Sequence, residues 1–188
     1  MAEDTKISSE CMKIYSSVEI NKHHIYLSNS IENESLEYFE LLKLLNEAHP
    51  TDQLYLHLAN FGGACHTGMM LAHAIRNCAA TAIVIVEAPC YSMGAIIALS
   101  GLALVMRPGT FLMFHNYSTV ESGKGGEVKA AVTEYSRHFV ASVKYFCTPF
   151  LTTKEIKTLQ KDEDIYIHAD DPTLPNRLTR HFKSMRLE

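Results

Sequence analysis

The sequence predicts an α/β domain built on a mainly parallel β-sheet with flanking helices. Strand-like and helix-like segments alternate along the chain, as they do where helices connect parallel strands. Residues 53–59 and 81–88 form nearly continuous apolar runs, which is typical of strands buried on both faces. The 188 residues are 47% hydrophobic and 20% charged, and no linker or repeat divides them, so we expect one domain over residues 1–188.

The first third of the chain supplies an arm, two strands and a helix. Residues 1–17 show no clear periodicity and are expected to form an N-terminal arm or a loose strand. Residues 18–28 have the pattern of a strand, and residues 53–59 form the second one. Between them, residues 33–47 have the pattern of a helix that ends before Pro50. Its apolar stripe consists of Leu36, Phe39, Leu42 and Leu45.

The middle of the chain alternates strands and helices more closely. The double glycine 62–63 follows the second strand and opens a helical segment. The β-branched run 81–88 predicts a buried strand, and residues 92–101 predict a helix. Residues 102–115 then predict two short strands that are separated by a break at residues 107–109.

The last third of the chain is mainly helical. A long amphipathic helix is predicted over residues 126–147, and Pro149 stops it. Thr152 and Glu155 have the spacing of a capping box, which predicts a shorter helix ending near Gln160. The apolar stripe of the long helix is Val128, Val132, Tyr135, Phe139, Val143 and Phe146.

Residues 88–106 contain no charge and raise the question of a membrane span. Polar and helix-breaking residues interrupt both ends of this window, and they are Pro89, Cys90, Tyr91, Ser92, Ser100 and Gly101. A membrane helix would also separate the strand at 81–88 from its sheet. We therefore predict a buried helix followed by a strand, and no contact with a membrane.

Composition excludes several classes of partner and ligand. The net charge of -4 argues against a nucleic-acid-binding surface. The five cysteines form no CxxC pair, and the first ten residues lack the pattern of a signal peptide, which favours reduced thiols in the cytoplasm. The ten histidines contain no HxxxH or HExxH motif, so we expect neither a metal nor a cofactor.

Ser92 lies where a strand gives way to a helix. The unpaired N–H groups of the helix start would favour negative charge at its hydroxyl, as in a nucleophile elbow. Only half of the GxSxG pattern is present, because Cys90 stands at the first glycine position. An ordinary helix-capping serine is the alternative.

Two further features would lie at the same end of the sheet. An amide of the double glycine 62–63, together with the N–H of Met93, could form an oxyanion hole, although a tight turn would explain the glycines equally well. His115 ends an apolar strand before a glycine-rich loop, where it could act as a general base or be a core or surface histidine. A carboxylate could orient that imidazole, and spacing does not choose among Asp162, Glu163, Asp164, Asp170 and Asp171.

Four segments in this order, LANFGGACHTGM, YSMGA, MFHN and DIYIHA, resemble the motifs of the ClpP family, the proteolytic subunits of the Clp protease. The resemblance covers roughly residues 25–169 and implies a serine endopeptidase on the ClpP/crotonase fold. By position, Ser92 would be the nucleophile and His115 the general base and acid. The resemblance selects Asp164 as the carboxylate that orients His115.

The same resemblance implies how substrate and partners would be bound. Gly63 and Met93 would supply the oxyanion N–H groups, and Gly62, Asn116 and Gly125 would lie along the bound polypeptide. The long helix would be the handle that joins heptameric rings of identical subunits into a tetradecamer enclosing a chamber. A Clp-type ATPase is an expected partner, whereas nucleic acid and membrane are not.

The chain departs from the family pattern at several positions. These are Phe61 for a proline, Tyr91 for a small residue, Asn116-Tyr117 for Gln-Pro, and Glu163 for an arginine that pairs across subunits. Residues 170–188 lack the family's usual ending and instead place apolar residues on one helical face, as a packing helix or a partner contact. The apolar residues of that face are Leu174, Leu178, Phe182 and Met185.

Two other functions are kept as alternatives. The substitutions around Ser92 and at Glu163 are compatible with an inactive or accessory subunit that serves a structural role in a ring. A crotonase-like acyl-CoA enzyme would use the same fold and a backbone oxyanion hole, but it would need no serine at position 92.

Overall fold

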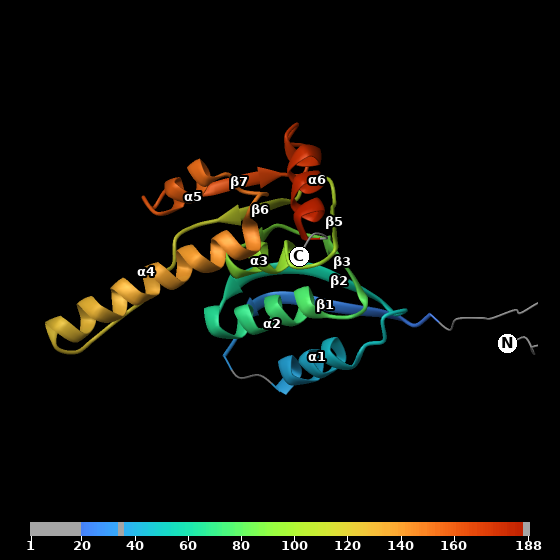
Figure 1. Cartoon of the computed structure of the whole chain (residues 1–188), viewed down its shortest axis with the longest axis horizontal. Coiled ribbons are helices and arrows are strands. Elements are labelled where there is room, and N and C mark those ends of the chain that lie inside the picture. The colour runs from blue at the N-terminus through green and yellow to red at the C-terminus, as the bar shows by residue number, and fades with distance from the viewer. Residues whose placement is uncertain (1–19, 34–35, 186–188) are drawn as a thin grey trace, which may run out of the picture.

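Two β-sheets form the framework of the protein in the computed structural model, which describes residues 20–33 and 36–185 (Figure 1). The larger sheet is entirely parallel, with the order β1-β2-β3-β5. Its strands are β1 (Lys22–Ile31), β2 (Gln53–Gly63), β3 (Thr81–Val86) and β5 (Ala103–Met106). The smaller sheet consists of β4 (Cys90–Tyr91), β6 (Phe111–Phe114) and β7 (Ile165–His168), in the order β4-β6-β7.

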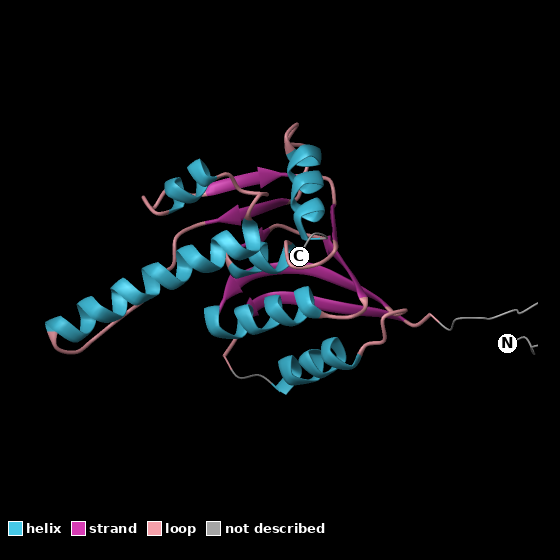
Figure 2. Ribbon diagram, in the orientation of Figure 1, coloured by secondary structure: helices cyan, strands magenta, loops and turns pink. Residues whose placement is uncertain are grey.

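Six helices are described, and most of them connect the strands (Figure 2). They are α1 (Leu36–Glu47), α2 (Cys65–Asn77), α3 (Met93–Ala98), α4 (Gly125–Cys147), α5 (Thr153–Leu159) and α6 (Leu174–Met185). The prediction of a mixed α/β fold with a parallel sheet and flanking helices is confirmed. The arm expected at residues 1–17 lies outside the described residues.

The core lies between the larger sheet and helices α1, α2 and α3. Side chains of β2 alternate between the two faces of the sheet, as the period of a strand requires. Leu54, Leu56 and Leu58 are completely or almost completely buried on the helix side. Truncating such a residue to alanine would cost about 2–5 kcal/mol, because the rigid surroundings leave a cavity. This packing fixes the end of β2, where the double glycine begins.

The uncharged window at residues 88–106 contains β4, α3 and β5, in agreement with the buried helix and following strand predicted for it. All six residues of α3 are buried. Across the described ranges, no helix combines the length and the apolar character needed to cross a membrane.

Three elements differ from the sequence-based expectation. The double glycine 62–63 belongs to the end of β2, where it pairs with β1, and the helix begins only at Cys65. No strand was expected at β4 or β7, which are short and are defined by pairing with β6. The β6–β7 pair is antiparallel, so the smaller sheet is mixed.

The C-terminal helix α6 is attached to the core, which supports the packing alternative for this segment. Leu174 is buried, and Leu178 and Phe182 pack against the core. The Arg177 guanidinium donates hydrogen bonds to both carboxylate oxygens of Glu155, at 3.0 and 2.8 Å. Burial raises the pKa of the Glu155 carboxyl, but hydrogen bonds from Arg177 and from its capping partner outweigh it and hold the pKa at about 2. The ion pair therefore ties α6 to α5, whose capping box is also confirmed.

Candidate active site

Ser92 occupies a sharp turn between β4 and α3. Its backbone has φ 54° and ψ -122°, a region that residues with side chains rarely enter and that costs on the order of 1–3 kcal/mol. The Ser92 N–H donates to the Met113 carbonyl of β6 at 2.8 Å, which fixes the turn against the smaller sheet. Its hydroxyl makes no capping hydrogen bond to α3, so it does not act as the helix cap.

Two glycines allow this turn to approach β2. A Cβ atom on Gly62 would lie 2.7 Å from the Ser92 Cβ and 3.1 Å from the Met93 nitrogen. A Cβ atom on Gly94 would lie 2.8 Å from the Asn60 carbonyl oxygen. The buried Asn60 side chain also accepts a hydrogen bond from the Gly62 N–H at 2.9 Å. The end of β2 and the serine turn are therefore packed backbone to backbone.

The proposed oxyanion donors lie at the two sides of this contact. Met93 is the first residue of α3, so its N–H has no acceptor within the helix. Gly63 has φ +130° and lies against the backbone of Ile31 in β1, where only a glycine fits. Each residue is held by secondary structure and not by a loop.

The register of the β6–β7 pair bears on the choice of Asp164 as the partner of His115. The last paired residues of the antiparallel β6–β7 ladder are Phe114 and Ile165. His115 and Asp164 each lie one residue outside this ladder, and a register continued by one position would oppose them and direct their side chains to the same face. This pairing favours Asp164 over the four other acids that the sequence left open.

No closed hydrogen-bonded triad is present in residues 20–33 and 36–185. Neither the Ser92 hydroxyl, nor the His115 imidazole, nor the Asp164 carboxylate has a hydrogen-bond partner there, and Asp164 is exposed. The neighbouring loop is ordered by other bonds, because the Asn116 amide donates to the Asp162 carboxylate at 2.7 Å. The structure therefore brings Ser92 and His115 to one pocket, and Asp164 is not among the residues that line it.

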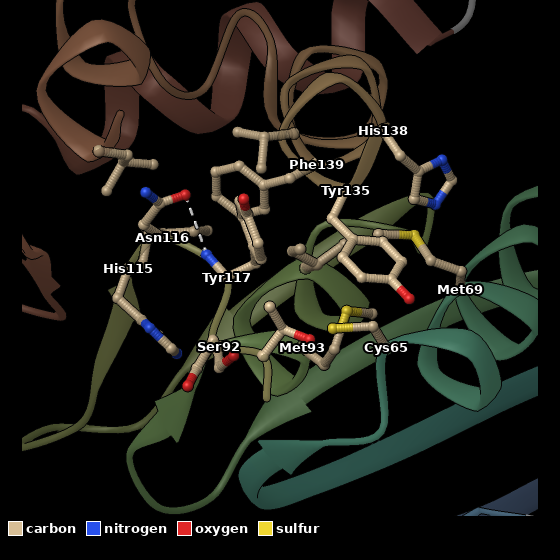
Figure 3. A pocket seen from close by; sticks show the side chains of 16 residues that line it. Cys65, Met69, Ser92, Met93, His115, Asn116, Tyr117, Tyr135, His138 and Phe139 are labelled. Carbon is tan, nitrogen blue, oxygen red and sulfur yellow. Dashed lines mark hydrogen bonds between the residues drawn. The ribbon is translucent and has the colours of Figure 1, made fainter. Parts of the chain in front are cut away.

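A cavity of about 200 Å³ lies beside Ser92 and His115 (Figure 3). Its walls are mainly apolar and come from α2, α3, β6, the loop after His115, α4 and α5. Figure 3 shows Ser92 and His115 on one side of the cavity and Tyr135 and His138 on the other. The cavity is large enough for one apolar side chain of a ligand.

Several residues of this pocket carried no functional signal in the sequence. Phe139 and Val143 belong to the apolar stripe of α4, which predicted packing alone. Cys65 and Met69 come from the first two turns of α2. Their position after the double glycine is the one feature that could have indicated them.

The loop after His115 is attached to α4 through Tyr117. The Tyr117 hydroxyl donates to the Val132 carbonyl at 3.0 Å, and its ring lies 5.8 Å from that of Phe139. Gly125, for which substrate contact stays a prediction, is the exposed first residue of α4 and does not line the cavity.

The electrostatics of the site favour the serine over the nearby thiols as a nucleophile. Burial raises the pKa of the Cys65 thiol, and it raises the pKa of Cys90 to about 11. Both thiols therefore stay mainly protonated at neutral pH, and neither is an activated thiolate. At the far side of the pocket, Glu121 raises the pKa of the Tyr135 phenol. Within the described ranges, no group of three or more metal-ligating side chains occurs.

The fold and the pocket define an α/β protein with a serine and a histidine at the ends of neighbouring strands. The chain matches the family model described as Clp protease over residues 6–171. Since this match covers most of the sequence, the chain belongs to the Clp protease family, and the resemblance found in the sequence is confirmed. No curated protein matches the chain significantly.

Proposed function

We propose that this chain is a serine endopeptidase of the ClpP type, with Ser92, His115 and Asp164 as its catalytic residues. The observation that supports this most directly is the convergence of two separate strand ends. The strained Ser92 turn and His115 line the same cavity, and the β6–β7 register supports Asp164 because its continuation by one position would oppose Asp164 to His115. Membership of the Clp protease family makes hydrolysis of peptide bonds the reaction that this arrangement would perform.

In the proposed reaction, the Ser92 oxygen attacks the peptide carbonyl while His115 accepts its proton. The N–H groups of Gly63 and Met93 stabilise the oxyanion that forms. His115 then gives the proton to the departing amine, which leaves an ester on Ser92. A water molecule, deprotonated by His115, hydrolyses that ester and restores the serine. Asp164 orients the imidazole and stabilises its charged form.

The open triad implies that Asp164 is engaged only in an assembled particle. We therefore infer that the chain works in the cytoplasm as stacked heptameric rings that enclose a chamber, with a Clp-type ATPase delivering unfolded polypeptides. The first half of α4 supports this inference, since Val132 and Tyr135 remain 39% and 43% exposed on its apolar stripe. Apolar side chains exposed along one helix are typical of a surface that a partner covers.

A fluorophosphonate probe tests the nucleophile. We expect the probe to label Ser92 in the assembled particle, and Ser92→Ala to abolish labelling and to lower peptide hydrolysis by about 10⁴-fold or more. An unlabelled serine, together with unchanged hydrolysis in the variant, would refute the proposal. Native mass spectrometry of the same sample tests the ring, and a monomer that still reacts with the probe would refute the chamber alone.

An accessory ring subunit without activity is the second candidate, and the unbonded His115 and Asp164 side chains favour it. In that case the assembled particle would show neither labelling nor hydrolysis. Failure of the probe in an intact ring therefore selects between the two functions.

A further inference from the structure

Five aromatic side chains form a continuous surface beside the candidate active site. We call this surface the aromatic shelf, and its members are Phe61, Tyr91, Phe111, Tyr166 and His168. The ring centroids of Phe61 and Tyr91 are 5.8 Å apart, and those of Tyr91 and Phe111 are 5.3 Å apart. Phe111 in turn lies 5.6 Å from Tyr166 and 5.3 Å from His168. Phe61 and Tyr166 are nonetheless 62% and 47% exposed.

The shelf ends at the catalytic residues. Tyr91 directly precedes Ser92, and Phe61 directly precedes Gly62, the glycine packed against Ser92. His115 directly follows β6 and is an even number of positions from Phe111, so a backbone that stays extended there would carry both side chains on the same face. The shelf therefore continues the surface from which His115 acts.

The shelf and the apolar cavity are separate surfaces. None of the five shelf residues lines the cavity, whereas Ser92 and His115 do, and Ser92 follows the shelf residue Tyr91 directly in the chain. The cavity is enclosed by α3, α4 and the loop after His115, whereas the shelf runs across β4, β6 and β7. A polypeptide that places one side chain in the cavity must leave the site in another direction, and the shelf offers the adjoining apolar surface.

We propose that the aromatic shelf binds the leaving-group side of the polypeptide substrate and selects aromatic or large apolar side chains there. This inference rests on the proposed peptidase function. An extended chain advances about 3.4 Å per residue, so side chains on one face repeat every ~7 Å, and each would lie close to a ring of the shelf. Offset stacking between such rings adds affinity beyond the buried area alone.

The shelf also accounts for two departures from the family pattern. Phe61 and Tyr91 stand where the family has a proline and a small residue, and the structure brings these two rings together. A substrate is the occupant that the position favours, because the surface begins at the atoms that would bond to the peptide. A neighbouring subunit seated on the shelf would instead block the approach to Ser92.

Two peptides test the specificity of the shelf. Both carry leucine before the scissile bond, and they carry either phenylalanine or alanine at the two positions after it. We expect wild-type particles to show kcat/KM about five- to tenfold higher for the phenylalanine peptide. Phe61→Ala and Tyr166→Ala, which alter exposed side chains, should bring this ratio close to one. Phe39→Ala, a control at the 56% exposed ring of α1, should keep the wild-type ratio.

Binding separates failure of the shelf from failure of the peptidase. In Ser92→Ala particles, fluorescence anisotropy should show the same five- to tenfold preference, and Phe61→Ala in that background should remove it. Equal binding of both peptides, or a preference that survives Phe61→Ala and Tyr166→Ala, would refute the shelf even if Ser92 is labelled and active. A change in particle mass in these variants, with the peptide preference intact, would assign the surface to a subunit contact and refute it as well. Absence of labelling and hydrolysis with the binding preference intact would refute the peptidase and leave the shelf as a peptide-binding surface.

Discussion

Replacing Gly62 by alanine should displace the nucleophile. The new Cβ would lie 2.7 Å from the Ser92 Cβ and 2.7 Å from the Tyr91 carbonyl oxygen, whereas ordinary contact begins at 3.4 Å. Backbone on both sides must therefore separate by about 0.7 Å, and a misplacement of ~1 Å can cost about 10²-fold in rate. We expect kcat/KM for peptide hydrolysis to fall by about 30- to 100-fold in Gly62→Ala.

A second glycine separates this contact from backbone strain. Gly62 has φ +83°, and alanine in that region costs roughly 1–2 kcal/mol without any clash. Gly109 has the nearly identical φ of +80°, but nothing lies within 4 Å of its added Cβ. Gly109→Ala should therefore lose only the stability that the backbone strain costs, roughly 1–2 kcal/mol, and keep its activity.

The assay combines labelling kinetics with unfolding. The second-order rate constant for fluorophosphonate labelling reports the position of Ser92, and urea unfolding at fixed protein concentration reports the strain. Labelling of Gly62→Ala at the wild-type rate would show that the β2 contact does not position the serine. An equal loss of activity in Gly109→Ala would show that general destabilisation, and not the contact, is responsible.

Three further predictions concern charge and thiol chemistry. Glu155→Gln should lower the free energy of unfolding at pH 7 by about 2 kcal/mol. This figure converts the pKa shift of the carboxyl from 4.5 to about 2 into energy and reduces it because the side chain is 23% exposed. Because this pKa is lowered in the folded state, the difference in unfolding free energy between the variant and wild type should persist above pH 4.5 and close as the pH falls toward 2 in urea titrations. A difference that does not change with pH would contradict the assignment of the stabilisation to the ionised Glu155 carboxylate. Asp164→Asn should lower kcat about 10³- to 10⁴-fold in the assembled particle. The control Glu163→Gln alters an exposed neighbouring carboxylate, and it should change kcat by less than about twofold and the free energy of unfolding by less than about 0.5 kcal/mol. When alkylation at pH 8 is followed by mass spectrometry, the exposed Cys65 should react in the folded protein. Cys147 is buried, which raises its pKa to about 12, and it should react only after unfolding. Reaction of Cys147 before unfolding would show that the core opens locally.

Long periodic segments were predictable because local patterns determine them. The stripe of α4 and the capping box at Thr152 fix these helices from a few turns of sequence. The strands β4 and β7 lack such a signal, because a run of two or four residues has too few alternations to indicate a strand. Pairing with β6, far away in sequence, creates both of them.

The candidate site was predictable in its order of residues and not in its geometry. The positions of Ser92 and His115 after apolar strands indicated the end of the sheet where they lie. Spacing alone left five acids open, and Asp164 was selected by the family resemblance; the β6–β7 pairing, which would oppose Asp164 to His115 if continued by one position, is information that no local pattern contains. The role of Tyr91 in the aromatic shelf was also not predictable, because only the structure shows that the rings of Phe61 and Phe111 lie beside it.

The glycine-packed turn at Ser92 has a consequence for how this enzyme class can diversify. A Cβ atom added at Gly62 would meet the Ser92 Cβ and the main chain of Tyr91 and Met93, and one added at Gly94 would meet Asn60, so both glycines should tolerate almost no substitution in a saturation-mutagenesis screen. Phe61 and Tyr91 flank the same turn but direct their rings away into the exposed shelf. In the proposed enzyme, residues that set reactivity and residues that set peptide preference would thus be neighbours in sequence with separate constraints, and single replacements at Phe61 or Tyr91 should change the preference and leave Ser92 in place.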